Sequence, residues 1–481
     1  MAGTGSCGAL IGMACALHEH AGKTTGRTVP HGPTAGVATT AAHGAGVPLG
    51  FYVLVVLVGA GLVLSALAPV LRRRVPRAWW LLCGYPVAVV RLRWTWRKLT
   101  DLQNLSVAKR PALGLIGDLV VRGRSLRTVP PRLGWAKWRR GGLAVRVRLH
   151  PGQTPDMYLG SVEAMAHAWR VFAVRITSQE RGFVTVTATA WDPLAAPQVP
   201  RAFATELLSA AVGQWEDGAA WVVSLRRVPH WLIVGATRSG KSTLLASLVS
   251  VWARQAVALV GIDLKGGMEL SLFETRLSAL ATTRTEAADL LARLVEIALD
   301  RMALCRSVGA RSIWELPDKG RPVPVIVLVD EVAELYLMAT SADKGEVGQV
   351  STALLRLAQL GAALGIHLIV AGQRVGSDLG TGVTALRAQL AGRVCHRVQD
   401  KGTAEMALGD LDKDALAAAQ QITPEQAGVA VAFGEGGGWM RARSTLTTPE
   451  QARRVAEKYA HLTPGLDALG WAPHDAGVVE P

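Results

Sequence analysis

The chain has 481 residues, half of them hydrophobic, and a formal net charge of +15. This length excludes a single small domain and predicts two or three folded units with additional segments. Five cysteines without a CxxC pair argue against a zinc site or a disulfide framework, and the basic excess predicts polyanionic partners, either nucleic acid or an anionic membrane face.

The N-terminal part of the chain predicts a membrane anchor. Residues 1–46 are rich in Gly, Ala, Thr and His, which predicts a disordered segment. Residues 47–71 are apolar and uncharged, which predicts a transmembrane helix, because about 20 apolar residues span a bilayer core. Arg72, Arg73 and Arg74 follow directly, and the positive-inside bias then places the rest of the chain in the cytoplasm, on the inner side of the cell membrane.

The excess of positive over negative charge lies in residues 72–140, which read as a basic juxtamembrane or linker segment. It either contacts DNA or anionic lipid, or is solvated and simply obeys the positive-inside bias. Within it, residues 79–90 form a short apolar stretch with an internal proline, which indicates an interfacial helix or, alternatively, a second span. Residues 141–204 show strand-like and helical patterns and predict a small α+β domain.

Residues 205–445 predict a motor domain, because apolar strand-like runs alternate with helical stretches from Pro229 onward, as in a parallel sheet with crossover helices. After an expected last strand at 429–433, residues 446–481 supply one helix and a polar tail. That is too little for a complete winged-helix module.

The strongest chemical signal is a phosphate-binding loop that matches GxxxxGK[ST]. Its glycines let backbone N–H groups converge on phosphates. Lys241 places a positive charge beside the β- and γ-phosphates, and the Ser242 hydroxyl is a ligand for Mg²⁺. The expected ATP-binding residues are Gly235, Ala236, Thr237, Arg238, Ser239, Gly240, Lys241, Ser242 and Thr243.

Two further apolar runs end in polar residues. The run at 324–329 ends in Asp330 and Glu331, which predicts that Asp330 binds Mg²⁺ opposite Ser242 and that Glu331 activates the attacking water. The run at 365–372 ends in Gln373. Because parallel strands end at the same ligand crevice, Gln373 is expected to reach the γ-phosphate or the attacking water as a sensor.

As a set, these motifs resemble the motor domain of FtsK/SpoIIIE translocases. The resembling segments are PHWLIVGATRSGKST, GIDLKGGMELSLF with its Asp263-Leu-Lys265-Gly266 element, VIVLVDEVAEL, GIHLIVAGQR and RVCHRVQDKGTAEMALGD. The resemblance implies a RecA-like fold, a hexameric ring, ATP hydrolysis at subunit interfaces and double-stranded DNA in the channel.

A ring ATPase also needs a positive charge supplied in trans to stabilise the transition-state phosphate. Arg393 and Arg397 are the candidates from the matching stretch, with Arg374 and Arg387 left open. Gly372 and Val375 depart from the usual family residues, which affects the geometry of the sensor.

The short chain with one or two spans is most similar to Tra-type proteins that move conjugative plasmids as double-stranded DNA. A septal chromosome pump is the second interpretation. A type VII secretion ATPase is a weaker one because this chain has a single P-loop. A non-hydrolysing binding protein is disfavoured because Lys241, Ser242, Asp330 and Glu331 are all present.

Overall fold

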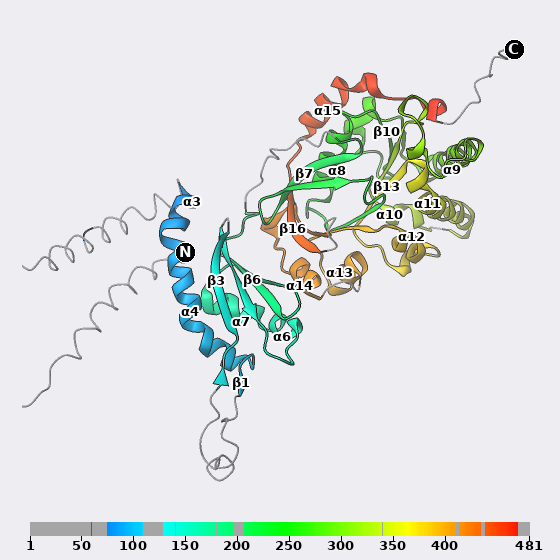
Figure 1. Ribbon diagram of the computed structural model, residues 1–481. Coiled ribbons are helices and arrows are strands. Elements are labelled where there is room, and N and C mark those ends of the chain that lie inside the picture. The colour runs from blue at the N-terminus through cyan, green and yellow to red at the C-terminus, as the bar shows by residue number, and fades with distance from the viewer. Residues whose placement is uncertain are drawn as a thin grey trace, which may run out of the picture. The chain divides into compact units, whose positions relative to one another are not determined.

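The computed structural model describes residues 75–108, 128–139, 141–178, 180–195, 206–338, 340–409, 413–433 and 438–469, together with Gly59. The predicted disordered segment and, apart from Gly59, the predicted transmembrane helix lie outside these residues. Among the helices that the structure does describe, none has the length and apolar character needed to cross a bilayer. The chain divides into two compact units, described separately below (Figure 1).

The N-terminal unit consists of a small four-stranded sheet and several helices, and the edge strand of the sheet pairs with its neighbour in antiparallel fashion. Its sheet has the strand order β3-β4-β6-β5. The strands are β3 (Arg132–Arg139), β4 (Gly142–Arg148), β5 (Ala173–Thr177) and β6 (Phe183–Thr189), and α7 (Val162–Trp169) lies between β4 and β5 in the chain, after α6 (Pro155–Leu159). Thus the sheet begins at Arg132 rather than near 141, inside the segment expected to be a linker.

A helical stretch precedes this sheet and covers its open edge. It consists of α3 (Pro76–Trp79), the π-helix η1 (Trp80–Gly84) and α4 (Tyr85–Leu102). The Tyr85 hydroxyl donates to the Ala136 carbonyl at 2.7 Å and the Trp96 indole N–H donates to the Pro131 carbonyl at 2.8 Å. Side-chain donors therefore reach the side of β3 that no strand covers, which protects an edge strand from pairing with other chains.

Residues 79–90, expected to form an interfacial helix or a second span, lie in this helical stretch, one side of which packs on the small sheet. Trp80 and Trp96 are both buried against the small sheet, at 8% and 4% exposure. The Trp96 ring also stacks on Trp169 of α7, with ring centroids 6.4 Å apart. The physical reason is that the sheet offers the indoles both apolar cover and carbonyl acceptors.

The C-terminal unit is built on one large sheet with the order β11-β10-β12-β13-β9-β14-β15-β16-β7-β8. Its strands are β7 (Ser209–Trp215), β8 (Ala220–Ser224), β9 (Trp231–Val234), β10 (Ala258–Ile262), β11 (Ala279–Ala281), β12 (Val325–Val329), β13 (Ile366–Gly372), β14 (Gly392–His396), β15 (Val429–Phe433) and β16 (Trp439–Ser444). From β11 to β14 the neighbouring strands pair in parallel, as expected.

The rest of the sheet is antiparallel, which the sequence analysis did not anticipate. β15, β16, β7 and β8 extend the parallel part through antiparallel pairs. The strand at 429–433 is therefore not the last one, because β16 follows it. The physical reason is connection length: β7 to β8 and β15 to β16 are joined by a few residues, and such short links allow only antiparallel neighbours. The sheet is mixed rather than parallel throughout.

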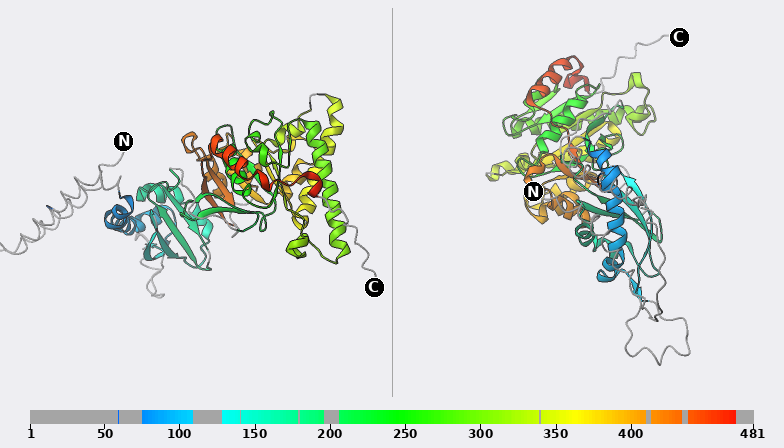
Figure 2. Two further views of the ribbon diagram at one scale, coloured as in Figure 1. Left: turned by 90° about the horizontal axis from the view of Figure 1, so that it is seen from above. Right: turned by 90° about the vertical axis from the view of Figure 1, so that its left-hand side faces the viewer.

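Helices cover both faces of this sheet. On one face α9 (Arg284–Ser307) and α11 (Lys344–Leu364) lie side by side (Figure 2), together with α12 (Val383–Gln389), α13 (Lys401–Leu408) and α14 (Lys413–Gln420). On the other face lie α8 (Lys241–Trp252), the 3-10 helix η2 (Ser271–Arg276) and α15 (Pro449–Lys458). Along β12, the Val327 side chain packs against the helices of the first face, and the Ile326 and Leu328 side chains pack against those of the other face. Because both faces of this parallel strand are buried, its sequence is apolar throughout.

Two sets of arginines fasten outlying segments to this core. Arg301 of α9 is fully buried and donates to the carbonyls of Val323, Leu364 and Leu469. It therefore holds the 3-10 helix η9 (Leu466–Leu469) near the end of the described chain. Burial lowers the pKa of Arg301 to about 10.

On β16, Arg441 pairs with Asp192 at 3.0 Å and with Glu216 at 3.1 Å. Arg443 of the same strand donates to the Leu194 carbonyl. The segment that follows β6 in the chain is thereby fixed to the large sheet.

Candidate functional site

The phosphate-binding loop connects β9 with the first turn of α8. Gly240 adopts φ +112°, and a Cβ added there would lie 2.4 Å from the backbone nitrogen of Gly428. A Cβ on Gly235 would lie 2.4 Å from the Ser239 hydroxyl oxygen. Both glycines are therefore required by close approach of the chain, and Gly240 also by its left-handed backbone. The loop delivers Lys241, Ser242 and Thr243 to the N-terminus of α8, where helix N–H groups favour an anion.

The structure brings the two acidic residues after β12 to this loop. The Lys241 ammonium donates to the Asp330 carbonyl at 3.0 Å and to Glu331 Oε2 at 3.1 Å. These side chains are buried, since Lys241 is 10% and Glu331 6% exposed. Residues almost ninety positions apart in the sequence thus meet in one buried contact.

Gln373 lies beside Glu331 because β13 is the strand between β9 and β12. Its backbone N–H donates to Glu331 Oε1 at 3.0 Å, while its side chain is exposed. The end of β13 therefore positions the carboxylate through the main chain. The exposed Gln373 amide remains available to a ligand.

A second lysine reaches the same carboxylate. Lys265, in the turn after β10, has its ammonium 3.5 Å from Glu331 Oε2. From the sequence, Lys265 was identified only as part of the Asp-x-Lys-Gly element, without a role. The turn is organised by Asp263, whose buried carboxylate accepts the backbone N–H groups of Lys265, Glu269 and Leu270.

The pocket contains polar atoms that fit a nucleotide and its metal ion. Within the described residues, the buried Ser239 Oγ and Asp330 Oδ1 have no hydrogen-bond partner. Burial raises the pKa of Asp330, and the nearby Lys241 opposes this effect. A desolvated carboxylate with a free oxygen is a suitable ligand for a divalent cation. Ser242 is the second residue of α8 and follows Lys241, whose ammonium contacts the Asp330 carbonyl.

The candidate arginines occupy different environments. The Arg393 guanidinium donates to the carbonyls of Arg387 and Ala407, and burial lowers the pKa of Arg393 to about 10. Arg397 donates to the Thr237 carbonyl, and its own carbonyl accepts from Ala236 N–H, so it lies beside the phosphate-binding loop of the same chain.

The two arginines that the sequence left open also differ. Arg387 donates to the Val375 carbonyl, whereas the Arg374 side chain is 56% exposed and only loosely paired with Asp378 at 3.9 Å. Of these four arginines, Arg374 presents the most accessible guanidinium.

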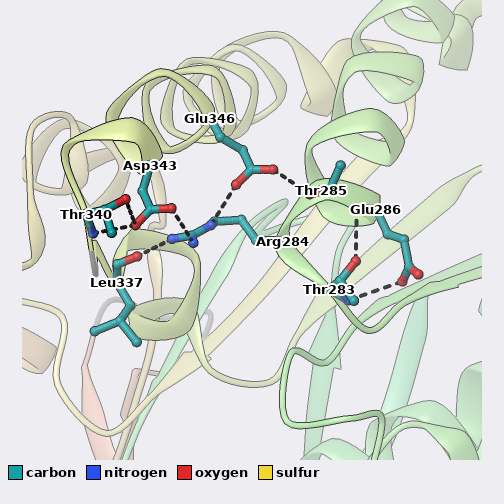
Figure 3. Close-up of polar contacts among 8 residues, drawn as sticks. All are labelled: Thr283, Arg284, Thr285, Glu286, Leu337, Thr340, Asp343 and Glu346. Atoms are coloured by element: carbon teal, nitrogen blue, oxygen red, sulfur yellow. Dashed lines mark hydrogen bonds and ion pairs between the residues drawn. The ribbon is translucent and has the colours of Figure 1, made fainter.

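The segment that follows Glu331 is held by an arginine that the sequence analysis missed. Arg284, the first residue of α9, pairs with Asp343 at 3.2 Å and with Glu346 at 2.9 Å, and it donates to the Leu337 carbonyl (Figure 3). The contacts fasten the end of α10 (Val332–Tyr336) and the start of α11 to α9. The network thereby fixes the far end of the segment that begins directly after Glu331. The only sequence signal was the helix-capping pattern Thr283–Glu286.

Comparison with known proteins gives consistent matches along the chain. Residues 66–190 match the actinomycete conjugal transfer protein N-terminal domain, and residues 199–322 and 315–377 match the FtsK/SpoIIIE family. The chain is 44% identical over 351 residues to "Transfer protein TraSA" of Streptomyces ambofaciens, which covers 71% of this chain and 85% of that relative. It is 49% identical over 245 residues to "Sporulation regulatory protein" of Streptomyces azureus, covering 51% and 81% of the two chains.

More distant matches extend to chromosomal motors and to solved structures. "DNA translocase FtsK" of Listeria monocytogenes is 32% identical over 232 residues, but this covers only 29% of that protein. The pCW3 conjugation coupling protein TcpA, solved as a monomer with ATPγS, has a TM-score of 0.53 and 20% identity, covering 77% of this chain and 98% of that one. This structural similarity concerns the fold.

Proposed function

The chain belongs to the FtsK/SpoIIIE family of P-loop ATPases, and from this premise we propose that it is an ATP-driven translocase that moves double-stranded DNA in conjugal plasmid transfer. The observation that carries the proposal is the buried contact of Lys241 with Asp330 and Glu331. It joins the two halves of a nucleotide-hydrolysing site in a chain that is 44% identical to a transfer protein over most of that protein's length.

In this proposal each pocket residue has a defined task. Lys241 leaves Glu331 and contacts the β- and γ-phosphates when ATP binds. Ser242 and Asp330 hold Mg²⁺, which when bound neutralises phosphate charge. Glu331 accepts a proton from the attacking water, and the exposed Gln373 side chain orients that water or senses the γ-phosphate.

We assign the functional assembly as a hexameric ring with DNA in its channel, as the family resemblance implies. The transition-state charge then requires a cation from a neighbouring subunit. Arg393 is engaged with carbonyls of its own chain and Arg397 with its own phosphate-binding loop. The exposed Arg374 is therefore the best placed of the four candidates for a role in trans.

We further propose that the protein is attached to the cell membrane, with the motor in the cytoplasm. Residues 47–71 supply the apolar anchor. The outward-facing side of α4 and η1 supports this proposal, because Leu82, Val90 and Trp94 recur at four- or eight-residue spacing and are 73%, 57% and 76% exposed. Exposed Arg93 and Arg97 flank them, and an apolar stripe bordered by arginines fits the surface of an anionic bilayer.

Steady-state ATPase measurements with and without duplex DNA test the proposed function. We expect duplex DNA to stimulate hydrolysis, and the affinity for DNA to fall steeply with added salt because bound phosphates release counterions. Stimulation by a secreted protein but not by DNA would instead favour a type VII secretion ATPase. Comparing plasmid with chromosomal fragments in single-molecule translocation would separate plasmid transfer from chromosome segregation.

A further inference from the structure

Lys265 contacts the carboxylate to which the proposed function assigns water activation. We propose that Lys265 restrains Glu331 while DNA is absent, and that duplex DNA relieves this restraint by attracting the Lys265 ammonium. The inference rests on the proposed role of Glu331. It makes Lys265 a positioning residue that links DNA binding to hydrolysis.

The arrangement of donors around Glu331 supports the restraint. Oε2 lies 3.1 Å from the Lys241 ammonium and 3.5 Å from that of Lys265, while Oε1 accepts the Gln373 N–H at 3.0 Å. ATP is expected to withdraw Lys241 toward its phosphates. Lys265 then becomes the remaining cation on Oε2. A carboxylate held in this way by a cation is kept away from the attacking water.

The backbone of the turn that carries Lys265 is held in place by hydrogen bonds to Asp263. Asp263 is 1% exposed and accepts three backbone N–H groups of the turn, at 3.2, 2.8 and 3.1 Å. Gly266 and Gly267 have φ angles of +71° and +75°, which permit the tight reversal after Lys265. The Asp263 bonds anchor the backbone of the turn, and the contact with Glu331 is made by the Lys265 side chain alone.

The exposure of Lys265 explains why an external polyanion can compete for it. Its side chain is 32% exposed, against 10% for Lys241 and 6% for Glu331. The neighbouring Met268 is 72% exposed, so the turn reaches the surface of the unit. The long 3.5 Å contact is also weaker than the 3.1 Å contact of Lys241. A DNA phosphate approaching this turn can thus exchange for Glu331 as the partner of Lys265.

The experiment measures ATPase kcat and KM of the full chain with and without duplex DNA for the wild type and for Lys265→Met. We expect the DNA-free kcat of Lys265→Met to rise about tenfold, the loss of one charge-assisted contact. KM should stay within about twofold because Lys241 is untouched, and the stimulation ratio should fall. Lys265→Arg should restore the low DNA-free rate. Lys458→Met, which changes an exposed lysine of α15, is the matched control and should behave as the wild type.

The outcomes separate this inference from the proposed function. If the wild type shows no DNA stimulation, the proposed translocase function fails. If the wild type is stimulated but Lys265→Met keeps a wild-type DNA-free rate, the restraint is refuted. A lowered rate that Lys265→Arg does not rescue also refutes it, because it indicates a structural role. Should Lys265→Met unfold, Lys265→Gln gives the same test with a polar side chain.

Discussion

If Glu331 activates the attacking water as proposed, we expect the exchange Glu331→Gln to separate nucleotide binding from hydrolysis. The Lys241–Glu331 contact of 3.1 Å is buried, and ATP must displace it to engage Lys241. The exchange removes one of the two charges from this contact, and a charged partner strengthens a hydrogen bond by about 1–1.5 kcal/mol over a neutral one. The competing contact therefore weakens by about 1–1.5 kcal/mol in the variant. This difference corresponds to an ATP affinity up to about tenfold higher.

Turnover should change in the opposite direction. Loss of a general base lowers kcat by about 10²–10⁴. Equilibrium binding of a non-hydrolysable ATP analogue and steady-state ATPase with duplex DNA measure the two effects on one preparation. Glu334→Gln, on α10 and three residues further along, is the matched control and should leave both quantities near wild type. Full turnover of Glu331→Gln, or an affinity lowered as if Lys241 were absent, would refute the assignment.

Three further predictions concern the pocket and the core. Lys241→Ala should lose most binding of the same ATP analogue, and retained affinity would contradict the role of Lys241 at the phosphates. Arg301→Met leaves three carbonyls without their donor, at about 1–3 kcal/mol each, so urea unfolding should show a loss of at least about 3 kcal/mol in the free energy of unfolding. Arg306→Met, on the exposed side of α9, is its control. Equal effects of the two substitutions would count against a stabilising role of the Arg301 contacts. Burial lowers the pKa of His396 from 6.5 to about 4, so His396 contributes stability above pH 6.5 that is lost as the pH falls toward 4, up to about 3 kcal/mol. His396→Asn should therefore flatten the fall of melting temperature over this range, and an unchanged slope would show that other groups cause it.

The sequence predicted the parallel core of the motor well, because a strand buried on both faces must be apolar throughout. The runs at β9, β12 and β13 are of this kind. It failed for β16, with the sequence WMRARS, and for β3, with RLGWAKWR. The arginines of β16 are needed for contacts with other segments, and those of β3 are exposed at the edge of a sheet. The charge of both strands therefore makes their sequences resemble those of linkers. Partly buried strands depend on neighbours that are distant in the sequence.

For the site, motif spacing predicted the components but not their contacts. Lys241, Asp330 and Glu331 could be grouped because each follows a recognisable strand. Lys265 could not be assigned to Glu331, since its reach depends on the turn that Asp263 organises. Similarly, the Arg393 guanidinium donates hydrogen bonds to carbonyls of two neighbouring helices. No local sequence pattern predicts these contacts.

The attachment of residues 192–195 to β16 determines where mechanical load enters the motor. A force that pulls on the N-terminal part of the chain reaches β16 through contacts that include the Arg441–Asp192 ion pair. β16 is an interior strand, flanked by β15 and β7, so tension there is shared across several rows of backbone hydrogen bonds. The strands that carry the nucleotide pocket are thereby shielded from direct pulling during the work stroke.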